Sequence, residues 1–397
     1  MRYRFVSFCG LLVMLGLAYV LSEKRRAVKP RVVLWGLALQ LVLVLFVLKT
    51  EPGSWLFRGV DRLFGRILAF STEGAGFLFG DLAVSVPTYG AFVAFQVLPV
   101  IIFIASLSAI LYHLRVIQAV VRGMAWIMHR TMKISGAESV AAALLVFMGI
   151  ESVAAVGKYV ACMTRSELFV VMTAFLATIA SSVMAAYVGF GASAGHLMAA
   201  SLMSAPAAIV IAKIMVPETE VPVTAGRVEF EPEVKTLNVV DAAATGAAEG
   251  VKLALNIGAM LIAFVALIAL VNFLLEWATG CTVQQIFGYA FSGFAALMGV
   301  PKGEWLQVGE LLGIKTVLNE FLAYERMQGM VLSERARIIA TYALCGFANF
   351  GSIAILIGGL SGVAPGRRGE VAGLGIRALI AGTLAAFMTA CYAGMLA

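Results

Sequence analysis

Long apolar runs are the feature that most limits what this chain can fold into. Residues 5–21, 32–48, 92–112 and 253–275 contain no charged side chain. A helix of about 20 such residues crosses the hydrocarbon core of a bilayer, which is roughly 30 Å thick, and satisfies its own backbone hydrogen bonds there. Hydrophobic residues make up 61% of the 397 and charged residues 13%. We therefore expect an all-α polytopic membrane protein with about eight transmembrane helices, including spans at about 168–190 and 338–357, and an amphipathic helix at 60–70 that lies in the interface.

The basic residues orient these spans. Residues 23–31 contain five lysines and arginines, and such clusters stay on the cytoplasmic side. The N-terminus then lies outside if residues 5–21 are a retained span. The alternative, a signal peptide, lacks a small-residue cleavage site after the apolar run. Because the net charge of +7 comes largely from short loops between apolar runs, it indicates orientation in the membrane rather than nucleic-acid binding.

Residues typical of enzymes and metal sites are scattered. The chain has no HExxH, GxGD or Walker sequence, so we expect no enzymatic activity and no cofactor. The cysteines lack CxxC spacing and neighbouring histidines, so we interpret them as small lipophilic residues rather than zinc ligands. They are Cys9, Cys162, Cys281, Cys345 and Cys391.

Two segments, residues 140–156 and 305–330, are short of apolar length and marked by glycines; the first contains Glu151, and the second is centred on Asn319 and Glu320. Basic residues flank the first segment on both sides. Equal flanks favour a re-entrant hairpin that enters and leaves on one side, where protein or a water-filled cavity supplies the backbone hydrogen bonds. One ordinary tilted span is the alternative.

The two halves of the chain repeat this pattern. Glu151 precedes a serine pair by 30 and 31 residues, and Glu320 precedes Asn349 and Ser352 by 29 and 32. Paired interrupted segments indicate the binding site of a secondary transporter with inverted repeats, where an acid at membrane depth is usually kept for a substrate or ion. Glu320 could instead reach an interface or pair with Lys315 or a nearby arginine, and Asn349 could only bridge helices. A channel or receptor would not require such paired segments.

Four strings also match a known family. They are TRSELF (164–169), SAPAAIVIAKIMVPETE (204–220), NEFLAY (319–324) and ATYALCGFANFGSIAI (340–355). In order and spacing they resemble the concentrative nucleoside transporters, in particular the bacterial NupC-like members, over about residues 50–390. The resemblance implies a homotrimer in a bacterial inner membrane that takes up nucleosides by an elevator motion coupled to an ion gradient. Cation-coupled transport of a nucleobase or another ribosylated metabolite is the alternative.

The resemblance also divides the chain. It implies, in order, scaffold spans (1–50), an interfacial helix region (51–85), a scaffold span (86–115), a first re-entrant hairpin with transport-domain spans (116–216), a cytoplasmic linker (217–236), an interfacial helix with a scaffold span (237–300), and a second re-entrant hairpin with transport-domain spans (301–397).

The same resemblance places Glu320 at the tip of the second hairpin, bound to ribose hydroxyls, with Asn349 and Ser352 completing the ribose site and Phe347 packed beside it. The chemistry agrees, because an ionised carboxylate accepts two hydroxyl donors at once and a ribose offers a vicinal pair. A deoxy analogue would leave one acceptor unpaired.

The first hairpin departs from the family. Where the family usually has Gly-Gln-Thr-Glu-Ala-Pro, residues 148–153 read MGIESV, so only Glu151 is kept. Gly149 and Ile150 stand in place of the side chains that contact the base in the family. This predicts a roomier, less polar base pocket that admits a purine.

The coupling ion is the other departure. The resemblance assigns a sodium site to the hydroxyl of Thr178 and the carbonyls of Ile179 and Val183, but the family asparagine is replaced by Leu144. A hard cation needs oxygen ligands, which leucine cannot supply. Buried carboxylates such as Glu151 and Glu320 can carry a proton. Both H⁺ and Na⁺ stay open, and the sequence favours H⁺.

Overall fold

The computed structural model describes residues 2–84, 93–149, 157, 159–226 and 236–397. All regular secondary structure in these residues is helical, which confirms the all-α expectation for this part of the chain. Within these described residues, seven helical stretches are long and apolar enough to cross a membrane by length and composition. The helices, in chain order, are α1 (Arg2–Val20), α2 (Pro30–Lys49), α3 (Glu51–Phe79), α4 (Asp81–Val84), α6 (Val93–Gln96), α7 (Leu98–His113), α8 (Val116–Met132), α9 (Gly136–Leu145), α11 (Arg165–Ala177), α12 (Ser181–Gly189), α13 (Ala194–Met215), α14 (Val239–Thr279), α15 (Val283–Leu297), α16 (Trp305–Val317), α17 (Glu320–Gln328), α18 (Glu334–Leu344), α19 (Phe350–Val363) and α20 (Arg368–Leu396).

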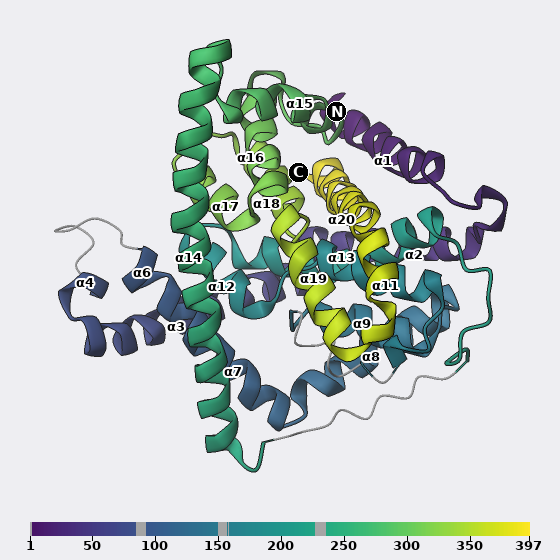
Figure 1. The fold of residues 1–397 in the computed structure, drawn as a ribbon, viewed down its shortest axis with the longest axis horizontal. Helices are drawn as coiled ribbons and strands as arrows, with labels where there is room; N and C mark the ends of the chain where they lie inside the picture. Colours follow the sequence, from purple (N-terminus) through teal and green to yellow (C-terminus); the bar gives the residue numbers. More distant parts are fainter. Residues whose placement is uncertain (1, 85–92, 150–156, 158, 227–235) are drawn as a thin grey trace.

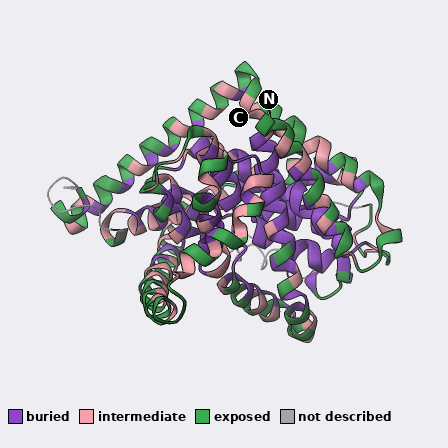
Figure 2. Ribbon diagram, turned by 90° about the horizontal axis from the view of Figure 1, so that it is seen from above, coloured by how far each residue is buried: buried purple, intermediate pink, exposed green. Residues whose placement is uncertain are grey.

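A helical core occupies the middle of the molecule. Helices α11, α13 and α20 pack against one another, and α2 covers α13 while α1 covers α20. Figure 2 shows buried residues concentrated at this centre and exposed residues on the outer helices. The two chain ends lie together (Figure 1), where the guanidinium Nε of Arg4 donates to the carbonyl oxygen of Ala397 at 3.2 Å.

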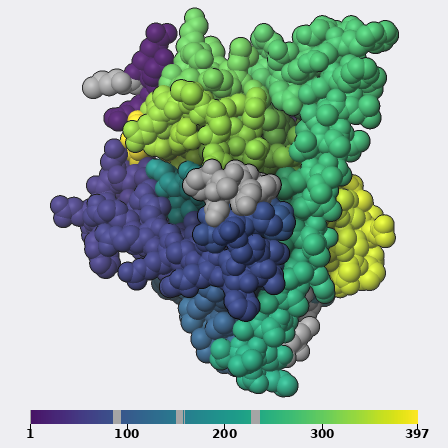
Figure 3. Space-filling model, turned by 90° about the vertical axis from the view of Figure 1, so that its left-hand side faces the viewer, coloured from purple at the N-terminus to yellow at the C-terminus, as the bar shows by residue number. Residues whose placement is uncertain are grey.

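Helix α14 forms a long column at the edge of this core (Figures 1 and 3). It packs against α7, where Gly246 and Gly250 let the two backbones approach and Ser106 donates its hydroxyl to the carbonyl of Ala243 at 2.9 Å. The interfacial helix predicted after residue 237 and the apolar span that follows it form one continuous helix, because α14 runs unbroken from Val239. The alanine-rich stretch contains no proline and so continues into the apolar span.

Two segments predicted as continuous spans are interrupted helices. The predicted span 168–190 is split between α11 and α12, with Thr178 in an extended conformation. The predicted span 338–357 is split between α18 and α19, with Gly346 at a φ of 144°. The interruptions cross, and the amide of Phe347 donates to the carbonyl of Thr178 at 3.2 Å. Each break therefore supplies a hydrogen-bond partner for the other.

The interfacial helix and the third span also differ from the predicted bounds. The amphipathic segment predicted at 60–70 is part of the longer α3, which begins after the Thr50 cap. Of the span predicted at 92–112, α7 begins at Leu98 and is preceded by the short α6. The helix bounds differ from the predicted ones because apolar residues continue past the helix ends, whereas each end is fixed by a single capping residue.

Candidate functional site

The turn between α16 and α17 presents an acid inside the apolar core. Asn319 caps α17 by accepting the amide of Leu322 at 2.9 Å. This cap makes Glu320 the first helical residue, where the unpaired amides of a helix N-terminus favour negative charge. Glu320 is 5% exposed, so its carboxylate depends on protein partners rather than water.

Those partners come from two other segments. The hydroxyl of Tyr187, on α12, donates to Oε1 of Glu320 at 2.8 Å, and the side-chain amide of Asn349 donates to Oε2 at 2.9 Å. An ionised carboxylate has about four acceptor positions, so acceptor capacity remains for a ligand hydroxyl beside these two donors. Glu320 and Asn349, which the spacing in the sequence grouped together, are thus in direct contact.

Asn349 also begins α19. Its side-chain oxygen accepts the amide of Ser352 at 2.8 Å, so one amide group both caps a helix and holds Glu320. The ring of Phe347 lies 5.8 Å from that of Phe175, centroid to centroid, at a tilt of 39°. The structure thus gathers Phe347, Asn349 and Ser352 within one short segment after the helix break.

Aromatic rings enclose the carboxylate. Tyr187 stacks on Tyr324 with ring centroids 4.4 Å apart, and Phe321 meets the edges of Tyr187 and Phe190. Sequence reasoning did not assign Tyr187 a role. The available signal was a tyrosine within an apolar helix, whose buried hydroxyl needs an acceptor.

The residues assigned to the first half are described only in part. Gly149 is buried, whereas Ile150 and Glu151 lie outside the described residues. Thr178 donates its hydroxyl to the carbonyl of Ala174 at 2.8 Å. Ile179, Val183 and Leu144 are buried. Thr178 therefore lies at the interruption, but its hydroxyl and its carbonyl each already hold a protein hydrogen bond.

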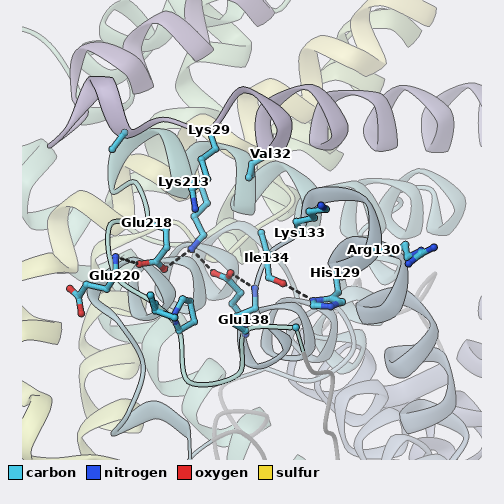
Figure 4. Close-up of a pocket in the computed structure, with 16 residues that line it drawn as sticks. Lys29, Val32, His129, Arg130, Lys133, Ile134, Glu138, Lys213, Glu218 and Glu220 are labelled. Atoms are coloured by element: carbon cyan, nitrogen blue, oxygen red, sulfur yellow. Dashed lines mark hydrogen bonds and ion pairs between the residues drawn. The ribbon is translucent and has the colours of Figure 1, made fainter.

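A second polar cluster lies away from Glu320, around a cavity of about 530 Å³ lined in part by Lys29. Figure 4 shows Lys213 between two carboxylates, with Nζ 2.7 Å from Glu138 and 3.2 Å from Glu218. Glu138 also completes a capping box with Ser135 at the start of α9. Because its cation and carboxylates bind one another and a helix end, we interpret this cluster as a structural tie between α9, α13 and the following linker.

Comparisons with known proteins cover nearly the whole chain. Family models match at residues 9–82 (Na⁺ dependent nucleoside transporter N-terminus), 94–194 (Nucleoside recognition) and 196–394 (Na⁺ dependent nucleoside transporter C-terminus). An uncharacterized transporter of Haemophilus influenzae is 41% identical over 404 residues, covering 98% of this chain and 97% of the relative. The sodium/nucleoside cotransporter 1 of Rattus norvegicus is also 41% identical, over 420 residues, and the match covers 98% of this chain but 63% of the longer rat protein.

Two solved structures are similar to this chain over its whole length. CNTnw in an inward-facing, substrate-bound state is 39% identical, with a TM-score of 0.95 over 100% of this chain and 98% of that chain. A doubly substituted CNTnw in an outward-facing state is 38% identical, also with a TM-score of 0.95, over 100% of this chain and 99% of that chain.

Proposed function

The chain belongs to the family of Na⁺-dependent, concentrative nucleoside transporters, and from this premise we propose that it takes up nucleosides across a bacterial inner membrane by cation-coupled secondary transport. The observation that carries the proposal is the buried Glu320, held by Tyr187 and Asn349 within a set of apolar helices. A carboxylate kept in such surroundings is usually kept for a ligand.

The proposed ligand contacts follow from the donors and acceptors. Glu320 offers an ionised carboxylate with remaining acceptor capacity, which suits the vicinal hydroxyls of a ribose. Ser352, one turn into α19, adds a hydroxyl to the same region, and Phe347 offers a ring face to the base. From the sequence resemblance alone, we assign the first-hairpin residues Gly149 and Ile150 to the base side of the site and Glu151 to the substrate site.

Competition against labelled uridine uptake into proteoliposomes tests the substrate. Ribonucleosides should compete well, and 2′-deoxynucleosides about tenfold less well, because one charged acceptor loses its donor. Free bases should compete poorly. Saturable uptake in which free bases compete as well as ribonucleosides would favour the alternative nucleobase transporter, and an absence of uptake in all cases would overturn the proposal.

The transport motion is also part of the proposal. We place α16–α17, and the segment beginning with α9, as re-entrant hairpins of a mobile transport domain, with α7 and α14 in the scaffold. The close packing of α14 on α7, apart from the central core, supports this division. Inward-facing and outward-facing states of CNTnw support an elevator-type motion for this chain.

For the coupling ion we propose H⁺. The family models are named for Na⁺, but the buried Leu144 adds no oxygen ligand where the sequence resemblance places an asparagine. Uptake should be driven by an inward proton gradient without sodium. Robust accumulation under a sodium gradient at equal pH, with none under the proton gradient, would show instead that water or another group completes a sodium site.

We further propose a homotrimer assembled through α14 and α7. Most of α14 is unburied within one chain, including the large apolar side chains of Leu255, Ile262 and Phe273. Cross-linking and native mass measurement in mild detergent should give a trimer. Recovery of monomer alone, from protein that still transports, would contradict this assembly.

A further inference from the structure

A lysine lies buried close to the substrate site without a role in the scheme above. Lys315, in the last turn of α16, is fully buried, and its ammonium donates to the carbonyl of Ala343 at 3.0 Å. A neutral carbonyl does not balance a full positive charge in an apolar core. The ammonium therefore needs a negative group nearby.

Glu320 is that group by position. Residues 318 and 319 alone separate the end of α16 from the start of α17, and Lys315 and Glu320 are both buried at this junction. The helix ends add to the pairing, because the carbonyl end of α16 favours a cation and the amide end of α17 favours an anion. Two opposite charges thus lie at one helix junction.

We propose that Lys315 is a positioning residue for the substrate site. Its positive charge keeps Glu320 ionised while water is excluded from the site. This inference rests on the proposed function, which gives Glu320 to the ribose. Protonation would turn one carboxylate oxygen into a donor and remove an acceptor that a ribose hydroxyl requires. The hydrogen bond to the carbonyl of Ala343 fixes the Lys315 ammonium to α18, the helix that leads to Asn349.

Lys315 and Glu320 also set the net charge of the site during the proposed transport motion. Lys315 and Glu320 together contribute no net charge, so an empty site would cross the membrane interior without an added charge from these residues. The proton in a proton-coupled cycle would then be carried by another acid. The sequence candidate is Glu151, outside the described residues.

Other titratable groups face the same carboxylate. They are Tyr187 on α12, Tyr324 on α17 and Cys345 after α18. None of them is a cation, so among the groups that the structure describes around Glu320, Lys315 alone supplies positive charge.

A double-mutant cycle tests the inference. The variants are Lys315→Met, Glu320→Gln and the double variant, with Lys302→Met as an exposed control before α16. Each single variant leaves one charge uncompensated, so its thermal unfolding temperature in detergent should fall. The double variant should unfold at a higher temperature than Lys315→Met, since removing both charges leaves none unpaired. Lys302→Met should behave as wild type.

The pH dependence of uptake gives a second readout. Lys315→Met should raise the KM for uridine at least tenfold near pH 7, and the KM should fall towards wild type as pH rises to about 9, because alkaline pH restores the ionised Glu320. Lys315→Arg should keep the weaker pH dependence of wild type.

Additive thermal shifts in the cycle would overturn the inference and leave Lys315 as an anchor for Ala343 only. A pH-independent defect in a folded Lys315→Met would do the same. The thermal cycle needs no nucleoside, so its outcome is separate from the substrate assignment, which wild-type uptake decides.

Discussion

Replacing Glu320 with Gln is expected to lower nucleoside uptake at least tenfold. The change keeps the shape of the side chain but removes the anionic acceptor, and the ribose hydrogen bonds lose charge assistance of about 1.5–3 kcal/mol. One amide position also becomes a donor facing Tyr187 or Asn349, which both donate to this residue. Initial uptake rates of labelled uridine, normalised to inserted protein, measure the loss.

Glu325→Gln is the matched control, because it makes the same chemical change on the same helix at an exposed position. It should transport within about twofold of wild type. If Glu320→Gln transported as well as Glu325→Gln while correctly inserted, Glu320 would not bind the substrate.

Replacing Gly346 with Ala is expected to destabilise the fold and abolish most uptake. An added Cβ would lie 2.8 Å from the backbone oxygen of Ala177, which no rotamer change can relieve, and the φ of 144° disfavours a side chain. Overpacking and backbone strain together should cost about 2–4 kcal/mol. Thermal unfolding of detergent-solubilised protein should show a clear drop in midpoint, alongside reduced uptake.

Gly358→Ala provides the comparison within α19, where an added Cβ meets no atom within 4 Å. Its unfolding midpoint should match or slightly exceed that of wild type, because alanine favours a helix over glycine. Equal unfolding midpoints for Gly346→Ala and Gly358→Ala would mean that the close contact between the two helix breaks is not needed for stability.

Hydropathy located most of the spans, because burial in lipid requires long apolar runs whatever the tertiary contacts. The helix interruptions were not predicted. Thr178 and Gly346 lie in runs that are apolar on both sides and lack proline, and their backbone conformation depends on the crossing with the other break. The hydropathy pattern depends on residues that are close in sequence, so it does not predict such a contact.

The candidate site shows the same division. An acid and a polar pair at matched spacing in the two halves of the sequence pointed to Glu320 and Asn349, and the structure brings these two together. Tyr187 was missed because its partner lies 133 residues away. Lys315 was noticed only as a possible partner of Glu320, since sequence spacing gives no burial and no contact with Ala343.

The crossing of the two interruptions bears on how substrate and ion are linked. The amide of Phe347, two residues before Asn349, is bonded to the carbonyl of Thr178, which the sequence resemblance alone links to a cation. An occupant that fixes either break restricts the other through this one peptide contact. By thermodynamic reciprocity, a cation that tightens nucleoside binding through this contact must itself be bound more tightly, by the same factor, when the nucleoside is present.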